Sequence, residues 1–310
     1  MRLLASFLGE RGRRYHGSRG APDAASQHGT RLSAHLAYGC LSLREVVQAT
    51  RRVRQQASDP RWIRSLEAFL SRLYWHCHFM QKLEDQPDIE WRNLQRSLDG
   101  LREDPPNPQR LAAWREGRTG YPLVDACMRS LTACGWLNFR MRALLMSFAS
   151  YLLNLHWQQP GQHLARLFTD YEPGIHWSQV QMQSGTTGIN AWRIYNPLRQ
   201  SLSHDPHGHF IRRWVPELRR VPDAWIHEPW KMPKAVQTQH GCRIGTDYPA
   251  PLIDHQQAAR QARQALREHL AKHRLEAGEE RQQIRQRHAS RSRKPRLRRP
   301  PNTQQLHFEF

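Results

Sequence analysis

The sequence predicts an all-α fold. Apolar residues recur at helical spacing in several segments, of which residues 62–74 and 141–155 are the clearest. Alternating apolar and polar runs, which indicate strands, are scarce. The chain has 310 residues, of which 38% are hydrophobic and eleven are tryptophan, so it can bury a large core. This composition argues against collagenous, coiled-coil and wholly disordered proteins.

Helix boundaries can be read along the body of the chain. Ser42 and Glu45 have the spacing of a capping box, which opens a helix. Pro122 suits a first helical turn, and Gly135 suits the residue after a helix ends. Residues 9–29 and 171–206 have little periodicity, so we expect long loops there. Long loops in a compact domain are frequently functional.

The C-terminal part is strongly basic, with 14 basic and 5 acidic residues in 256–310. Its first part, rich in Ala, Gln, Arg, Leu and Glu, predicts an exposed helix up to His288. The remainder has no core formers and predicts disorder. We therefore expect a helical domain at 1–254, a basic helical extension at 255–288 and a disordered basic tail at 289–310. The tail either keeps the protein in solution or is a non-specific arm for nucleic acid.

Charge and cysteine usage restrict the partners and the compartment. The 47 Lys and Arg against 27 Asp and Glu give a formal charge of +20, which predicts a polyanionic partner, first of all nucleic acid. Five cysteines without a Cys-x-x-Cys pair favour a reducing, cytoplasmic location. No apolar run approaches the roughly 18 residues of a membrane span. The histidines within 76–78 and 204–209 lack the usual ligand spacing, so we expect no metal.

Three segments carry candidate chemistry. Residues 30–33 place hydroxyls around an arginine ahead of a short helix, a pattern that holds phosphate but also makes an ordinary helix cap. Asp125 and Arg129 are four residues apart and can pair on one helix face. Residues 167–197 form a polar, glycine-containing stretch that resembles a ligand wall.

Several blocks resemble, in order, the C-terminal FAD-binding domain of the DNA photolyase and cryptochrome superfamily. They are TRLSAHLAYGCLS (30–42), GRTGYPLVDACMR (117–129), GWLNFRMR (135–142), RIYNP (193–197), and GHFIRRWVPEL with VPDAWIHEPW (208–230). The resemblance implies a helical domain that holds folded-back FAD and absorbs blue light. In photolyases, reduced flavin donates an electron to a pyrimidine dimer in DNA, and the dimer splits.

The resemblance implies a set of flavin contacts. They are Tyr15, Thr30, Arg31, Leu32, Ser33, Trp136, Arg142, Asp170 and Glu172. In the family, the segment at 30–33 wraps the diphosphate and ribityl chain. Arg142 and Asp170 match an ion pair against the flavin ring, although a purely structural buried pair is the alternative.

Tryptophans match the family's electron relay. Trp91 and Trp157 align with two of its members. The innermost position aligns with Ser178, and Trp177 stands one residue before it. Any one of these tryptophans can instead simply fill a core.

On the substrate side, the resemblance implies Trp75, Arg72 and Arg193 as contacts to DNA. Arg72 stands where dimer-repairing photolyases usually have Glu, and Phe139 stands where an asparagine is expected. Loss of these groups removes hydrogen bonds to the thymine edges and argues against ordinary duplex repair. A lesion in a single strand is cheaper to bring into a buried site.

Three functions remain open at this point. The first is a blue-light FAD enzyme similar to deoxyribodipyrimidine photo-lyase that repairs a pyrimidine lesion in UV-damaged DNA, with single strands as the expected preference. The second is a cryptochrome-like photoreceptor without repair activity, and the third is a flavin-free DNA-binding scaffold. The family's α/β antenna domain has no match in these 310 residues, either because the member is short or because the gene start is misplaced. We therefore expect no antenna chromophore in this chain.

Overall fold

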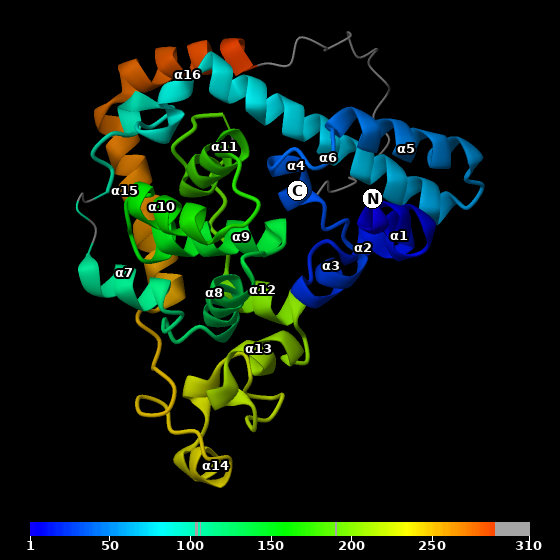
Figure 1. Cartoon of the computed structure of the whole chain (residues 1–310). Coiled ribbons are helices and arrows are strands. Elements are labelled where there is room, and N and C mark those ends of the chain that lie inside the picture. Colours follow the sequence, from blue (N-terminus) through cyan, green and yellow to red (C-terminus); the bar gives the residue numbers. More distant parts are fainter. Residues whose placement is uncertain (103–104, 106, 190, 289–310) are drawn as a thin grey trace, which may run out of the picture.

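The computed structural model describes residues 1–102, 105, 107–189 and 191–288. Within these ranges the only β-structure is an isolated bridge between Ile244 and Tyr248, and all longer elements are helical (Figure 1). The predicted all-α fold is confirmed. None of the described helices has both the length and the apolar character needed to cross a membrane. All five cysteines are free thiols.

The first seven helical elements form a lobe on one side of the molecule (Figure 1). They are α1 (Arg2–Gly9), η1 (Arg11–Arg14), α2 (Tyr15–Ser18), α3 (Pro22–His28), α4 (Ser33–Ala37), α5 (Leu43–Gln56) and α6 (Pro60–Asp85). The predicted capping box of Ser42 and Glu45 opens α5. The prediction of a long loop at 9–29 is wrong, because this segment contains α2 and α3. These helices are too short to show a period, and tertiary contacts such as the Tyr15 ring 5.5 Å from Phe7 hold them.

The long helix α6 joins this lobe to the centre of the molecule. Asp59 caps its first turn by accepting a hydrogen bond from the N–H of Arg61 at 2.9 Å. The second half of α6 packs against α11 (Pro173–Ser184). The two helices approach so closely that a Cβ on Gly174 would lie 2.6 Å from the carbonyl oxygen of Phe79. This contact fixes the position of one lobe against the other.

The central helices surround the main apolar core. They are η2 (Pro87–Glu90), η3 (Arg96–Leu98), α7 (Pro108–Arg115), α8 (Pro122–Cys134), α9 (Phe139–Ser147), the π-helical turn η4 (Phe148–Leu152), α10 (Gln158–Leu167) and α11. Pro122 begins α8 and Gly135 ends it at φ 66°, as predicted. The prediction of a long loop at 171–206 is also wrong, because this segment contains α11 and α12 (Pro197–His204). Buried polar residues such as Gln181 and Ser184 hide the apolar period of α11.

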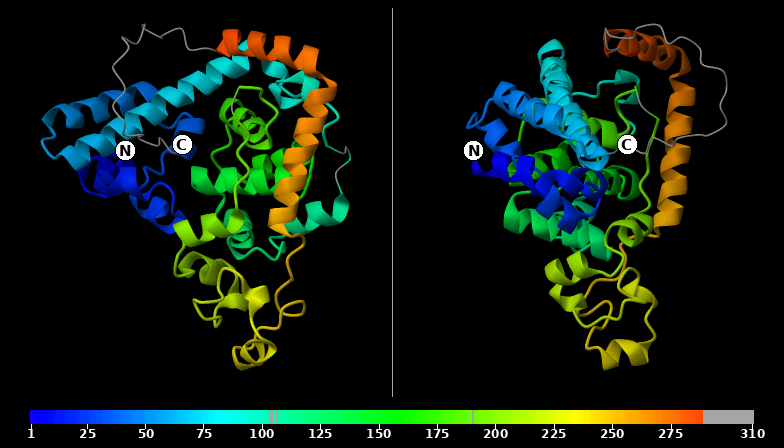
Figure 2. Two further views of the ribbon diagram at one scale, coloured as in Figure 1. Left: turned by 180° about the vertical axis from the view of Figure 1, so that it is seen from behind. Right: turned by 90° about the vertical axis from the view of Figure 1, so that its right-hand side faces the viewer.

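The chain ends in a lower subdomain and two outer helices. The lower part contains α13 (His209–Trp214), η5 (Pro216–Leu218), η6 (Pro229–Lys231) and α14 (Lys234–Gln239). The single exposed helix expected at 256–288 is instead α15 (His255–Lys272) and α16 (Arg274–His288), which break at His273. Figure 2 shows α15 lying along the body, where Leu266 is buried with Leu98 and Tyr151. The predicted tail at 289–310 lies outside the described residues.

A buried carboxylate ties α8 to the segment before α15. Asp125 accepts hydrogen bonds from the N–H and hydroxyl of Thr119, from the N–H of Gly120, and from the hydroxyl of Tyr248. Burial raises the pKa of Asp125 to about 6. The predicted pairing with Arg129 is wrong: Arg129 contacts Glu217 at 2.8 Å. The turn before α8 surrounds Asp125 with donors of its own, so the carboxylate faces inward.

We expect Asp125→Ala to lower the free energy of unfolding by at least about 3 kcal/mol, because it strands several buried donors. Tyr248→Phe removes only one of these donors and should cost about 1 kcal/mol. Urea unfolding monitored by circular dichroism measures both values. Equal, small losses in the two variants would contradict a shared network centred on the carboxylate.

Candidate functional site

An arginine–carboxylate pair forms the deepest charged contact of the candidate site. Nη2 of Arg142, on α9, lies 3.0 and 2.7 Å from the two carboxylate oxygens of Asp170. Nε of Arg142 donates to the carbonyl oxygen of Leu137 at 2.7 Å. The side chain of Asp170 is 3% exposed, whereas that of Arg142 is 25% exposed. The charges compensate each other, and the guanidinium keeps one accessible edge.

Arg31 reaches the same place from the N-terminal lobe. Its backbone has φ 58°, which non-glycine residues seldom adopt. Its guanidinium lies 4.0 Å from the centre of the Trp136 ring. Burial lowers the pKa of Arg31, and the nearby charge of Asp170 opposes that shift. Arg142 and Arg31, more than 100 residues apart in sequence, therefore both interact electrostatically with Asp170, Arg142 through hydrogen bonds and Arg31 through its nearby charge.

The strained turn at Arg31 is held from outside. Arg11 donates to the carbonyl oxygens of Gly29 and Thr30, the latter at 3.2 Å. The hydroxyl of Thr30 accepts a weak hydrogen bond of 3.4 Å from the N–H of Leu32. Such support is what keeps a rare backbone conformation in place, and it is typical of ligand-binding turns.

The side chains of residues 30–33 do not all point in the same direction. Leu32 is 1% exposed and packs with Phe7 and Val46, so its side chain belongs to the core of the lobe. Thr30, Arg31 and Ser33 are half-buried. Of the predicted set, Leu32 can therefore contribute only its backbone to a ligand.

The inner face of α6 completes the wall next to this turn. Arg72 lies 5.8 Å from the centre of the Trp75 ring. Burial raises the pKa of Tyr15, and the nearby Arg72 opposes that rise. One turn further along α6, Nε2 of His76 lies 2.7 Å from a carboxylate oxygen of Glu172. Arg72 and Trp75 thus lie on α6, Tyr15 belongs to α2, and Glu172 is the residue before α11 that contacts α6 through His76.

Two of the predicted relay tryptophans are in contact. The ring centres of Trp157 and Trp177 are 5.8 Å apart, with the planes at 68°. Both side chains are buried, and the indole N–H of Trp177 donates to the hydroxyl of Tyr171 at 3.0 Å. Ser178, which aligns with the innermost position, is a buried hydroxyl and cannot carry an electron hole. Trp177 is therefore the aromatic residue at that end of the pair.

The third predicted member, Trp91, lies at the surface. Its side chain is 61% exposed. Its carbonyl oxygen accepts a hydrogen bond of 2.6 Å from the side chain of Gln158, the residue that follows Trp157. Trp157 and Trp177 are therefore buried and in contact, whereas Trp91 is exposed to solvent.

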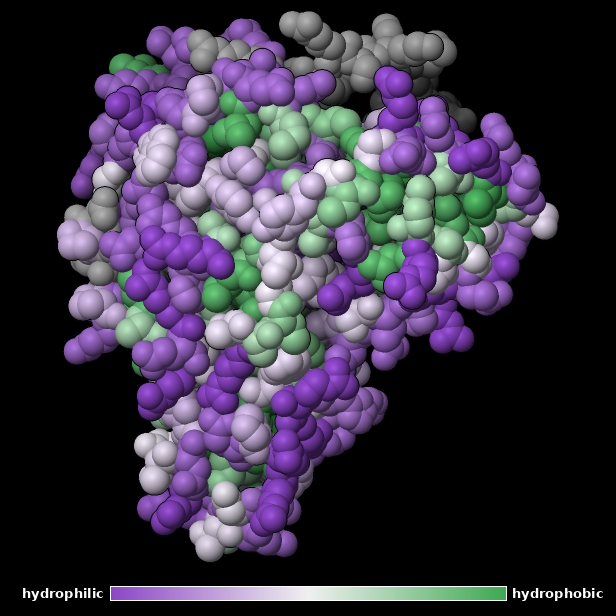
Figure 3. Space-filling view, viewed as in Figure 1, coloured by the Kyte–Doolittle hydropathy of each residue, from purple (hydrophilic) through white to green (hydrophobic). Residues whose placement is uncertain are grey.

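The substrate candidates lie on the surface. Trp75 is 40% exposed and Phe139 is 55% exposed. Arg193 is exposed on the stretch before α12, where its carbonyl oxygen accepts a hydrogen bond from Ser147 at 3.2 Å. Figure 3, in the view of Figure 1, shows apolar and weakly polar residues across the middle of the molecule, between strongly polar margins. The exposed rings of Trp75 and Phe139 are available to stack on a flat ligand group.

The sequence did not single out His176, which lies beside the ion pair. It is 8% exposed, and Nε2 lies 2.9 Å from the carbonyl oxygen of Gly161. Burial lowers the pKa of His176 to about 4, so the ring is neutral near pH 7. A helical interpretation of residues 173–184 would have found it, because His176 and Val180 are one turn apart on the buried face of α11.

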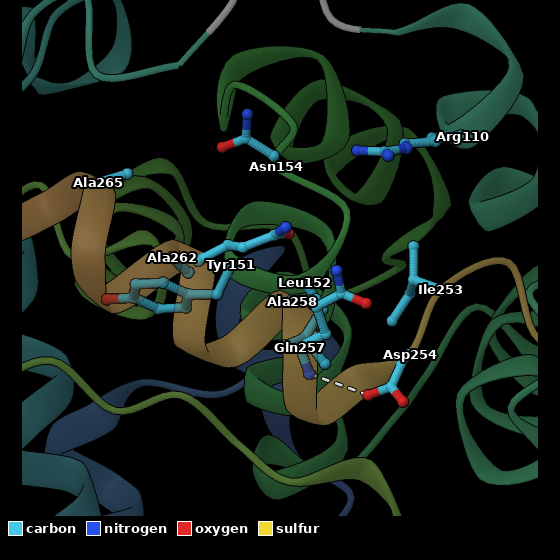
Figure 4. Close-up of a pocket in the computed structure, with 11 residues that line it drawn as sticks. Arg110, Tyr151, Leu152, Asn154, Ile253, Asp254, Gln257, Ala258, Ala262 and Ala265 are labelled. Atoms are coloured by element: carbon cyan, nitrogen blue, oxygen red, sulfur yellow. Dashed lines mark hydrogen bonds between the residues drawn. The ribbon is translucent and has the colours of Figure 1, made fainter.

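A pocket of 410 Å³ lies elsewhere, between α15 and the end of η4 (Figure 4). Arg110, Tyr151, Asn154 and Gln257 are among the residues that line it. None of the predicted flavin, relay or substrate residues takes part. The pocket is therefore separate from the candidate site.

Comparison with known proteins supports the fold around this site. Residues 69–268 match the family model described as the FAD binding domain of DNA photolyase. A deoxyribodipyrimidine photo-lyase of Alkalihalophilus pseudofirmus is 33% identical over 81% of this chain and 51% of that protein. The chain spans about half the length of the curated relatives it matches.

Two solved structures share the arrangement of helices. The cryptochrome of Synechocystis has a TM-score of 0.79 at 28% identity, over 85% of this chain and 54% of that one. A class III photolyase of Agrobacterium tumefaciens has the same TM-score and identity, over 86% and 55%. The individual site residues stay predictions.

The buried histidine has a consequence for stability. Between about pH 6.5 and 4 the unfolded chain binds a proton that His176 in the folded chain does not, so the free energy of unfolding falls on acidification. We expect His176→Gln, which keeps a donor for Gly161, to reduce this loss by up to about 3 kcal/mol. Chemical unfolding at a series of pH values measures it. The control is His209→Gln at an exposed position; an unchanged pH profile in His176→Gln would refute the assignment.

Proposed function

The chain belongs to the DNA photolyase and cryptochrome family, and from this premise we propose that it is a blue-light-absorbing FAD flavoprotein that repairs a pyrimidine photolesion in DNA. The observation that carries the cofactor proposal is the meeting of Arg31 and Trp136 with the Arg142–Asp170 pair. Charged groups rarely gather in a buried place unless they are paired or hold a ligand.

The residues present fit FAD. The guanidinium of Arg31 and the hydroxyls of Thr30 and Ser33 suit the diphosphate, since arginine binds phosphate oxygens with several donors. Arg142 and Asp170 offer a donor and an acceptor to the edge of a ring system. When bound, FAD supplies the light absorption and the one-electron chemistry, and the protein supplies position and electrostatics.

The tryptophans would restore electrons to the cofactor site from the surface. Contact between Trp157 and Trp177 favours electron hopping between their rings. Trp91 is exposed and can exchange electrons with a reductant in solution. His176 stays neutral beside Arg142 and so adds no charge to the site.

The proposed substrate is UV-damaged DNA, with single strands preferred. The net charge of +20 attracts a polyanion, and the exposed face of Trp75 can stack on an unpaired base. A base in a single strand has no partner to lose before it enters the site. We place the reaction in the class of the deoxyribodipyrimidine photo-lyases.

A cryptochrome-like photoreceptor is the second candidate, and a specific observation favours it. Arg72 occupies the position of the expected substrate-reading carboxylate and is engaged with Trp75 and Tyr15. Phe139, in place of an amide, is a hydrophobic group in the same region. A protein with flavin and relay but without these polar contacts could signal to a partner. A cytoplasmic location stays a prediction from the cysteine pattern.

We expect Asp170→Asn and Arg142→Ala to weaken FAD binding about tenfold or more, since a hydrogen bond to a charged group contributes about 1.5–3 kcal/mol. Flavin absorbance per mole of purified protein and titration with added FAD measure the effect. Glu217→Gln is the matched control, because it breaks the Arg129–Glu217 pair away from the site. Full flavin content in both site variants would overturn the cofactor assignment, and a colourless wild-type protein would support a flavin-free scaffold.

We expect Trp157→Phe to slow flavin photoreduction by blue light while flavin content stays unchanged, because phenylalanine is much harder to oxidise. Absorbance changes during illumination with an external reductant give the rate. Trp225→Phe, in the lower subdomain, is the control and should behave as wild type. The relay proposal fails if both variants photoreduce at the same rate.

Repair and signalling are separated by one assay. Reduced protein is illuminated with oligonucleotides that contain a pyrimidine dimer, either single-stranded or in duplex. Loss of dimers, faster in the single strand, is expected for the repair enzyme. Persistence of all dimers, in a protein that carries flavin and photoreduces, would establish the photoreceptor instead.

A further inference from the structure

One face of α5 presents mainly basic and amide side chains to solvent. Its members, which we call the α5 face, are Arg44, Gln48, Arg51, Arg52 and Gln55. They recur at spacings of three, four and seven residues, which places them along one side of the helix. All five are exposed, while the opposite side of α5 packs on α6 through Val46 and its neighbours. The face is a stripe about three turns long.

The acidic residues nearby are already engaged. Glu45 accepts hydrogen bonds at the start of α5, where it closes the capping box with Ser42. Glu67, on α6, pairs with Arg54 at 2.7 Å. Glu67 lies outside the α5 face. Glu45 lies at its N-terminal edge, three residues before Gln48, so the three arginines leave the stripe a net charge of +2 for an external partner.

Exposed aromatic rings accompany the stripe. Tyr74, on α6, is 53% exposed, and its hydroxyl accepts a hydrogen bond of 2.6 Å from Nη2 of Arg51. The next residue, Trp75, is 40% exposed and lies at the candidate site. Tyr38, four residues before the cap of α5, is 77% exposed. Figure 1 shows α5 lying beside α6, the helix that carries Tyr74 and Trp75.

We propose that the α5 face, with Tyr74, is a binding track for single-stranded DNA that leads to Trp75. This inference deepens the proposed function, because it names the surface that would hold the strand beside the lesion. Arginines would bind successive phosphates, and the tyrosine would stack on an unpaired base. The combination of cations and exposed rings is how proteins hold single strands without reading their sequence. A duplex hides the faces of its bases and gains nothing from Tyr74.

The test measures binding of a labelled, undamaged oligothymidylate by fluorescence anisotropy at several salt concentrations, with the full chain. Arg51→Gln/Arg52→Gln should reduce the slope of log affinity against log salt by about 1.4, because each lost phosphate contact accounts for about 0.7 in single strands. Tyr74→Ala should weaken binding about fivefold or more, whereas Tyr74→Phe, which keeps the ring, should bind nearly as wild type.

The matched control is Arg219→Gln/Arg220→Gln, an adjacent pair of exposed arginines after η5. It removes the same charge far from α5 and should leave the slope closer to that of wild type. An equal loss in both double variants, or an equal affinity for a duplex of the same length, would overturn the proposal. Flavin content is measured in parallel. If the α5 variants keep flavin and bind the oligonucleotide as wild type does, the binding track is refuted and the proposed function is not. If the wild type lacks flavin but binds the oligonucleotide through α5, only the proposed function is refuted.

Discussion

The site depends on one physical constraint: a carboxylate that is 3% exposed must be neutralised where it lies. Asp170 meets this constraint with Arg142 from the central helices and with the charge of Arg31 from the N-terminal lobe. An unpaired carboxylate there would be protonated or would open the structure to water. The need to compensate this charge therefore draws together two parts of the chain that are far apart in sequence.

The long helix α6 keeps this geometry in register. At one end its apolar side chains, such as Phe69, belong to the core of the N-terminal lobe. At the other end it touches α11 so closely that Gly174 has no room for a side chain. A shift of either lobe would separate Arg72 and His76 from the segment that carries Glu172. Rigid packing of this kind is what holds a binding site at fixed distances, because close-packed interiors do not deform continuously.

The residues that depart from the family pattern belong to the substrate side of the site and not to the Arg142–Asp170 ion pair. Arg72 and Phe139 change the polarity of the substrate side, whereas the cofactor side keeps its charged groups. The Arg142–Asp170 pair therefore concerns cofactor binding, whereas Arg72 and Phe139 concern the choice of substrate or partner. The α5 face adds to the partner-binding surface. Its charges are exposed to solvent, and water and ions screen their mutual repulsion.

The sequence by itself determined the helical fold, the start of α5 at Ser42, the ends of α8 and the pairing partner of Arg142, because caps, helix-ending glycines and linear motifs act locally or recur in a known order. It could not find α11 as a helix, since buried polar side chains carry no apolar period, and it did not show that α15 buries Leu266 on one side or that the helix ends before His273. Only tertiary structure decided that Leu32 faces the core and that His176 lies by the ion pair. Burial and charge proximity are properties of the packed chain, and spacing along the sequence does not encode them.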